Sequence, residues 1–217
     1  MDEILRARIV LKILNKIYPK TPIPLKHRNK FTLLVSVLLS AQTTDINVNN
    51  VTKNIYKKYY RPEHFVKLGK KKIQRMIKRI GLFRTKAKSV YMLSKQIKER
   101  HNGKVPRTFE DLENLQGVGH KTASVIMSQK FGIPAFPVDT HIHRLAQRWG
   151  LTNGKNVIQT EKDLKRIFPK KTWSKLHLQI IFYGREYCKA RDCYGLTCKI
   201  CTTCYPNRKK PVITKKA

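Results

Sequence analysis

The chain has few acidic residues and no long hydrophobic run. Only 13 of its 217 residues are aspartate or glutamate, against 47 lysines and arginines, which gives a formal net charge of +34. The longest uncharged apolar stretch, residues 31–44, covers 14 residues, which is too short to span a membrane and typical of a buried helix. The first ten residues carry acids at positions 2 and 3, so we predict no secretory signal and a cytoplasmic, nucleoid-associated protein.

Cysteine is also absent from most of the chain, since all five cysteines lie between residues 188 and 204. A disulfide framework would spread its cysteines through the fold. The clustering instead indicates a metal site, either tetrahedral zinc or an iron–sulfur cluster. The large positive charge indicates a polyanionic partner, and no amphipathic anchor supports a membrane, so we expect nucleic acid.

Apolar residues recur at helical spacing along most of the chain, and alternating strand patterns are absent. This predicts an all-α fold, with the stretch FTLLVSVLLSAQ (31–42) as a central buried helix. Glycine and proline between residues 132 and 137 indicate a boundary between two parts of the chain. We expect the final segment, 208–217, to be a basic and mobile tail.

The stretch LQGVGHKTA, residues 115–123, predicts two helices joined by a tight turn. Gly117 and Gly119 can both adopt positive φ, and they allow another backbone to approach closely. Val118 would then pin the two helices together. The amides at the start of the second helix would suit a phosphate group, although an ordinary helix–helix turn would have the same pattern.

Several motifs occur in order between Phe31 and Cys204: LLSAQTTDINVN, GLFRTKA, LQGVGHKTASVI, FPVDTHIHRLAQRWGL and the cysteine cluster. Together they resemble the helix–hairpin–helix superfamily of DNA glycosylases, and within it the endonuclease III family. The resemblance implies two helical domains flanking a DNA-binding cleft. Residues 23–133 would form a six-helix domain with the hairpin, and residues 1–22 and 134–207 a second domain with an iron–sulfur cluster loop. We expect a monomer that binds double-stranded DNA containing a damaged base or an AP site.

In this family pattern Lys121 is the nucleophile and Asp139 the matching carboxylate. The implied activity is that of a bifunctional DNA N-glycosylase and AP lyase, which removes oxidised pyrimidines through a Schiff base and cleaves the AP site by β-elimination. Relatives that only remove the base lack the lysine. The residues alone favour a different interpretation, in which Lys121 contacts a phosphate and Asp139, or its neighbour Thr140, is a helix N-cap. A non-catalytic DNA-binding module therefore remains the competing interpretation.

The resemblance also implies DNA-binding roles outside the hairpin. A flipped nucleotide leaves a gap in the duplex, which Gln42 would fill while Leu82 acts as an apolar wedge. Asp45 matches an acid near the substrate pocket. Gln42 could instead end a buried helix, Leu82 could belong to the core, and Asp45 could cap the next helix. His141 and His143 are interpreted as packing or DNA-facing residues.

The resemblance further implies a 4Fe–4S cluster, with ligands at positions 188, 195, 198 and 204. Three cysteines match these positions: Cys188, Cys198 and Cys204. Gly195 stands at the remaining one, so either Cys193 or Cys201 must supply the fourth thiolate. We predict Cys201, because the pair Cys198-x2-Cys201 preserves the paired cysteines of the motif. Zinc is the alternative cofactor.

Overall fold

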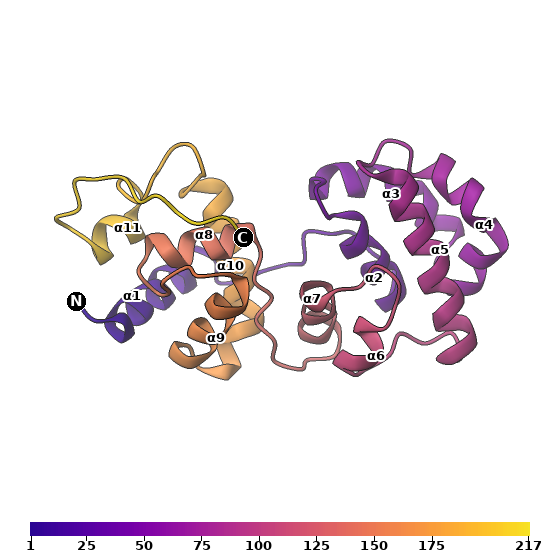
Figure 1. Cartoon of the computed structure of the whole chain (residues 1–217), viewed down its shortest axis with the longest axis horizontal. Helices are drawn as coiled ribbons and strands as arrows, with labels where there is room; N and C mark the ends of the chain where they lie inside the picture. Colours follow the sequence, from indigo (N-terminus) through magenta and orange to yellow (C-terminus); the bar gives the residue numbers. More distant parts are fainter. The chain divides into compact units, whose positions relative to one another are not determined.

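The computed structural model describes all 217 residues and contains only helices (Figure 1). The prediction of an all-α fold is therefore confirmed. The helices are α1 (Glu3–Ile17), α2 (Lys30–Leu39), α3 (Asp45–Lys58), α4 (Pro62–Met76), α5 (Phe83–Arg100), α6 (Phe109–Glu113), α7 (His120–Lys130), α8 (Thr140–Arg148), α9 (Val157–Ile167), the 3₁₀ turn η1 (Lys170–Thr172), α10 (Trp173–Glu186) and α11 (Lys199–Cys204). No helix has the length and apolar character that crossing a membrane requires.

The chain divides into two compact units. One joins Met1–Pro22 to Pro134–Ala217, and the other is the continuous stretch Ile23–Ile133. Each unit has its own hydrophobic core. The N-terminal helix α1 therefore packs with helices from the far end of the sequence, and Figure 1 shows it beside α10.

Helix α2 is the most buried helix of the Ile23–Ile133 unit, as its apolar sequence predicts. All residues from Phe31 to Leu39 are buried, and the helix packs against α3, α5 and α7. It starts at a capping box, in which the Asn29 side chain accepts from the Thr32 amide and the Thr32 hydroxyl accepts from the Asn29 amide, both at 2.9 Å. The turn that follows Ser40 is thus attached to the best-packed helix of the unit.

In the other unit, α1 packs against α9, α10 and α11, and α8 packs on α10. The Arg6 guanidinium of α1 donates to the carbonyl of Gly150 at 2.8 Å, which joins the helix to the loop after α8. Trp149 and Tyr183 are fully buried and meet edge to face, with ring centroids 5.7 Å apart. All five cysteines belong to the same core.

The segment 208–217 is hydrogen-bonded to this unit, where the sequence predicted a mobile tail. Its first side chain, Arg208, donates to the carbonyls of Arg148 and Gly195 at 2.7 and 3.0 Å. The Val212 amide donates to the carbonyl of Tyr194 at 2.9 Å. The segment therefore lies along the loop that carries the cysteines.

Candidate functional site

The predicted helical hairpin is formed by α6 and α7, with Gly117 and Val118 in the turn. Gly117 has a φ of +80°, and a methyl group placed on it would lie 2.8 Å from both Cβ and Oγ of Ser89. Val118 is 4% exposed and belongs to the core, as predicted for a residue that joins the two helices. These two residues therefore serve the internal packing of the hairpin.

Gly119 differs from Gly117, because it does not adopt the positive φ that glycine permits. Its φ is −96° and its ψ 178°, a conformation open to any residue. Apart from its two neighbours in the chain, a methyl group on Gly119 would have no residue within 4 Å. Gly119 is also the N-cap of α7, and no side chain caps this helix start. The missing side chain thus leaves the helix start open to an external group.

Lys121 is exposed in the first turn of α7, and its side-chain amine forms no hydrogen bond or ion pair within the chain. Its neighbour His120 is engaged inside the hairpin, since its Nδ1 lies 2.8 Å from Glu113 Oε1 and its ring stacks on Phe109. Residues 113–119 line an open surface pocket just before the lysine. An amine with no internal partner beside an open helix start is available to react with, or bind, another molecule.

Asp139 lies in the other unit and caps α8, so the N-cap interpretation of this residue is confirmed. Its Oδ1 accepts from the Ile142 amide at 2.8 Å, and Thr140 is the first residue of the helix. The side chain is half-buried, and the cap occupies one carboxylate oxygen. His143 is buried with its Nδ1 2.8 Å from the Thr160 hydroxyl, which makes it a packing residue.

Gln42 and Leu82 occupy neighbouring turns of the Ile23–Ile133 unit. Both have left-handed backbone, with φ of +53° and +57°, which is uncommon for residues other than glycine. Both side chains are exposed, Leu82 to 58%, so the interpretation of Leu82 as a core residue is wrong. A methyl group on Gly81 would lie 3.7 Å from the carbonyl oxygen of Gln42, so the two turns are in contact.

Asp45 begins α3 but does not cap it. The N-cap is Thr44, whose hydroxyl accepts from the Asn47 amide at 3.3 Å. The alternative interpretation of Asp45 as the N-cap is therefore wrong. Its carboxylate is half-buried in the first turn, where negative charge is favoured by the helix dipole.

Four of the five cysteines bring their sulfur atoms within 4.8 Å of one another: Cys188, Cys193, Cys198 and Cys201. All four are buried, and Cys201 Sγ lies 3.9 Å from Sγ of both Cys188 and Cys193. Hydrogen bonds from the thiols of Cys188 and Cys201 hold the pKa of Cys198 well below its usual range. The group contains no histidine or carboxylate, and an all-thiolate set suits zinc and iron–sulfur clusters.

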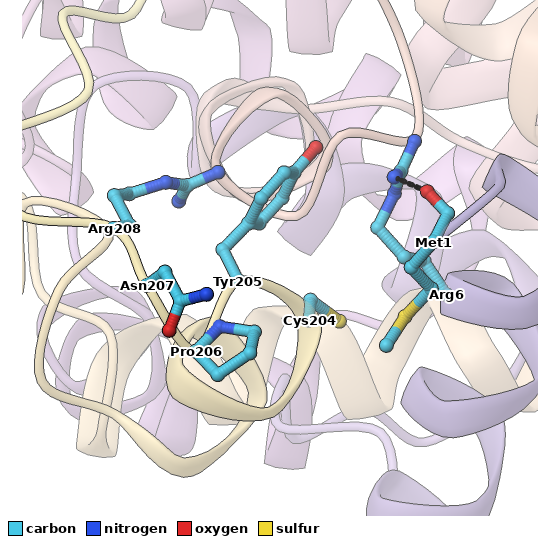
Figure 2. Close-up of a pocket in the computed structure, with 7 residues that line it drawn as sticks. All are labelled: Met1, Arg6, Cys204, Tyr205, Pro206, Asn207 and Arg208. Atoms are coloured by element: carbon cyan, nitrogen blue, oxygen red, sulfur yellow. Dashed lines mark hydrogen bonds between the residues drawn. The ribbon is translucent and has the colours of Figure 1, made fainter.

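Cys204 is buried outside this group, although the sequence placed it among the ligands. Burial raises the pKa of its thiol to about 11, which favours the protonated form. It lines a pocket of about 670 Å³ with other residues shown in Figure 2: Met1, Arg6, Tyr205, Pro206, Asn207 and Arg208. The Arg208 guanidinium carbon lies 3.6 Å from the centre of the Tyr205 ring.

The backbone at Gly195 explains why another cysteine joins the group. Gly195 has a φ of +85°, and a methyl group on it would lie 2.9 Å from Val212 Cγ2 and 3.0 Å from Arg208 Nη1. A cysteine would be strained at this position, because the segment after residue 207 packs against it. Cys193, two residues earlier, has its sulfur inside the group.

Sequence reasoning missed one residue that supports the cysteines, Arg148. This arginine is 2% exposed, and it donates to the carbonyls of Lys189 and Ala190 at 2.7 and 3.0 Å. Its Nη1 also lies 3.4 Å from the sulfur of Cys188. A buried guanidinium beside thiolates offsets their negative charge and fixes the loop that carries them. The sequence did contain a signal for its burial, because Arg148 falls on the buried face of α8, beside Leu145 and Trp149.

The comparisons with known proteins agree with these features. A family model described as HhH-GPD superfamily base excision DNA repair protein matches residues 35–170. Endonuclease III of Bacillus subtilis is 44% identical over 194 residues, which cover 89% of each chain. Endonuclease III of Rickettsia felis is 41% identical over 215 residues, which cover 97% of this chain and the whole of that one.

Solved structures give the same result for the fold. The structure of a trapped endonuclease III–DNA covalent intermediate matches with a TM-score of 0.87 and 39% identity, over 92% of this chain and 94% of that one. A thermostable thymine-DNA glycosylase matches with a TM-score of 0.77 and 23% identity, over 90% of this chain and 93% of that one.

Proposed function

Because the chain belongs to the HhH-GPD superfamily of base excision DNA repair proteins, we propose that it removes damaged bases from duplex DNA and then cleaves the strand at the AP site. The observation that carries the proposal is the start of α7. The side chain of Lys121 is exposed there and has no partner within the chain. Gly119, two residues earlier, is a glycine that neither the backbone conformation nor the packing requires. The expected substrates are oxidised pyrimidines, as the resemblance to endonuclease III implies.

The reaction begins at Lys121. Its uncharged amine attacks C1′ of the damaged nucleoside, a C1′–N bond to the lysine forms, and the glycosidic bond breaks as the base leaves with a proton. Ring opening gives a Schiff base, and loss of a proton from C2′ then expels the 3′-phosphate. The solved structure of a covalent endonuclease III–DNA intermediate supports covalent chemistry in this chain as well.

We assign Asp139 to the positive charge that develops on the sugar as the base departs, or to proton transfer during elimination. Its cap on α8 uses one carboxylate oxygen and fixes the side chain, which leaves the other oxygen for substrate. A carboxylate held in this way stabilises charge without reorganising during the reaction. The cap and the catalytic role are therefore compatible.

The nucleotide must leave the base stack before Lys121 can reach C1′. We propose that Gln42 enters the gap and hydrogen-bonds the unpaired base, while Leu82 wedges between the neighbouring bases. Two exposed side chains on adjoining turns with left-handed backbone support this assignment. The open start of α7, with Gly117, Val118 and Gly119, would hold a backbone phosphate.

The cysteine group has a structural role in this proposal. We assign the four ligands of a 4Fe–4S cluster to Cys188, Cys193, Cys198 and Cys201, with zinc as the alternative. Sulfur atoms bound to one tetrahedral zinc ion lie about 3.8 Å apart, since the Zn–S bond is about 2.3 Å. The two Sγ–Sγ distances of 3.9 Å from Cys201, to Cys188 and to Cys193, are close to that spacing. The bound group would fix the loop that presents Lys189, Arg191 and Lys199.

Borohydride reduction during incubation with AP-site or lesion DNA tests the proposal. Reduction of the Schiff base should join the protein covalently to DNA through Lys121, and Lys121→Gln should abolish the product. A binding module without catalytic activity would not be trapped at all. A monofunctional glycosylase would release the base but leave the strand intact.

A further inference from the structure

One lysine of the chain is buried, and it lies behind the turns that carry Gln42 and Leu82. Lys86 of α5 is 5% exposed, and its ammonium group donates to three oxygen atoms. These are the carbonyl oxygens of Leu39 at 2.9 Å and Ala41 at 2.5 Å, and the hydroxyl oxygen of Thr43 at 3.1 Å. Burial lowers the pKa of the Lys86 ammonium group.

Lys86 is hydrogen-bonded both to the turn around Gln42 and to the turn around Leu82. The acceptors of its side chain lie on either side of Gln42, at the C-terminal end of α2, where carbonyl groups lack helical partners. Its backbone amide donates to the carbonyl of Leu82 at 3.0 Å. Lys86 is therefore bonded to the residue before Gln42, to the residue after it, and to Leu82 itself.

We propose that Lys86 is a positioning residue for DNA distortion, which holds Gln42 and Leu82 in the conformation needed to enter the base stack. The inference rests on the function proposed above. Both residues have left-handed backbone and exposed side chains, so packing of those side chains against the core does not maintain that conformation. Three hydrogen bonds from the charged Lys86 ammonium can maintain it around Gln42, because charge-assisted hydrogen bonds are about twice as strong as neutral ones.

A role limited to packing accounts poorly for this arrangement. A buried ammonium without a counter-ion is costly, and an apolar side chain of similar length would fill the same space without that cost. The three hydrogen bonds of its ammonium group all go to residues 39–43, and none goes to another part of the core. The chain therefore retains a charge where it fixes the turn around Gln42.

The test compares the affinity for a duplex with a stable abasic analogue and the affinity for the same duplex undamaged. Neither measurement requires catalysis. Lys86→Met should lower the ratio of the two affinities by about tenfold, the loss expected when one hydrogen bond to the unpaired base is no longer formed. Lys88→Met removes the same charge from an exposed position of α5 and should leave the ratio unchanged.

A double-mutant cycle separates positioning from independent binding. If Lys86 acts through Gln42, the losses in Lys86→Met and Gln42→Ala should not add in the double variant. Additive losses, or a folded Lys86→Met protein with the wild-type ratio, would overturn the proposal. Should Lys86→Met not fold, Thr43→Val removes one acceptor, and an unchanged ratio there would overturn it equally. A wild-type protein without preference for the abasic duplex would overturn the proposed function and this inference together.

Discussion

The two glycines of the hairpin should respond to the same substitution in opposite ways. Gly117→Ala places a methyl group 2.8 Å from Ser89 at a residue with a φ of +80°. Left-handed backbone costs a residue with a side chain about 1–2 kcal/mol. Forcing a methyl group into a packed site costs about 1–3 kcal/mol more. We therefore expect Gly117→Ala to lower the free energy of unfolding by about 2–5 kcal/mol.

Gly119→Ala places its methyl group in open space on ordinary backbone. Its effect on the free energy of unfolding should stay within about 1 kcal/mol, because the poorer N-cap is offset by a less flexible unfolded chain. Its affinity for duplex DNA should nevertheless fall on the order of tenfold, since the methyl group occupies the approach of a phosphate to the start of α7.

Urea unfolding and DNA-binding titrations at fixed salt measure the two effects on the same pair of variants. Each variant is the control for the other, since the chemical change is identical. A Gly119→Ala protein that binds DNA like the wild type would show that the hairpin does not contact phosphate. A Gly117→Ala protein of wild-type stability would refute the packing argument.

Three further predictions concern the amine, the cysteines and the buried arginine. Lys121→Gln should lose borohydride trapping and strand cleavage while it still binds AP-site DNA, as gel electrophoresis and binding titrations would show. Cys193→Ser should lose bound metal, whereas Cys204→Ser should retain it. Metal analysis and the absorbance of the purified proteins test both expectations. The reverse result would favour the ligand set that the resemblance implies, with Cys204 in place of Cys193. Arg148→Met should lower the free energy of unfolding by about 3–6 kcal/mol, because it removes two charge-assisted hydrogen bonds of about 1.5–3 kcal/mol each. The control is Arg8→Met, at an exposed position, which should have little effect in the same urea experiment.

The sequence predicted the helical fold and the buried helix α2 because both depend on the spacing of apolar residues, which is visible in the chain itself. It also located the hairpin between α6 and α7. It could not distinguish Gly117 from Gly119, since glycine permits positive φ but does not require it. The difference comes from Ser89, a residue of α5 that touches only one of the two.

The supporting residues were harder to predict than the motifs. Lys86 and Arg148 are two among 47 lysines and arginines, and the sequence does not show which of these are buried. The sulfur group differs from the predicted ligand set for a related reason. Motif spacing favoured Cys204, whereas the path of the loop around Gly195 depends on contacts with Val212 and with other residues that follow the motif.

The pairing of α1 with α9, α10 and α11 affects how the chain is synthesised. The ribosome makes α1 well before these helices, and the packing of its apolar face stays incomplete until the last of them, α11, has been made. The stretch Ile23–Ile133 needs no distant segment for its core and can fold while translation continues. The hairpin with Lys121 can thus fold before the cysteine loop has been made.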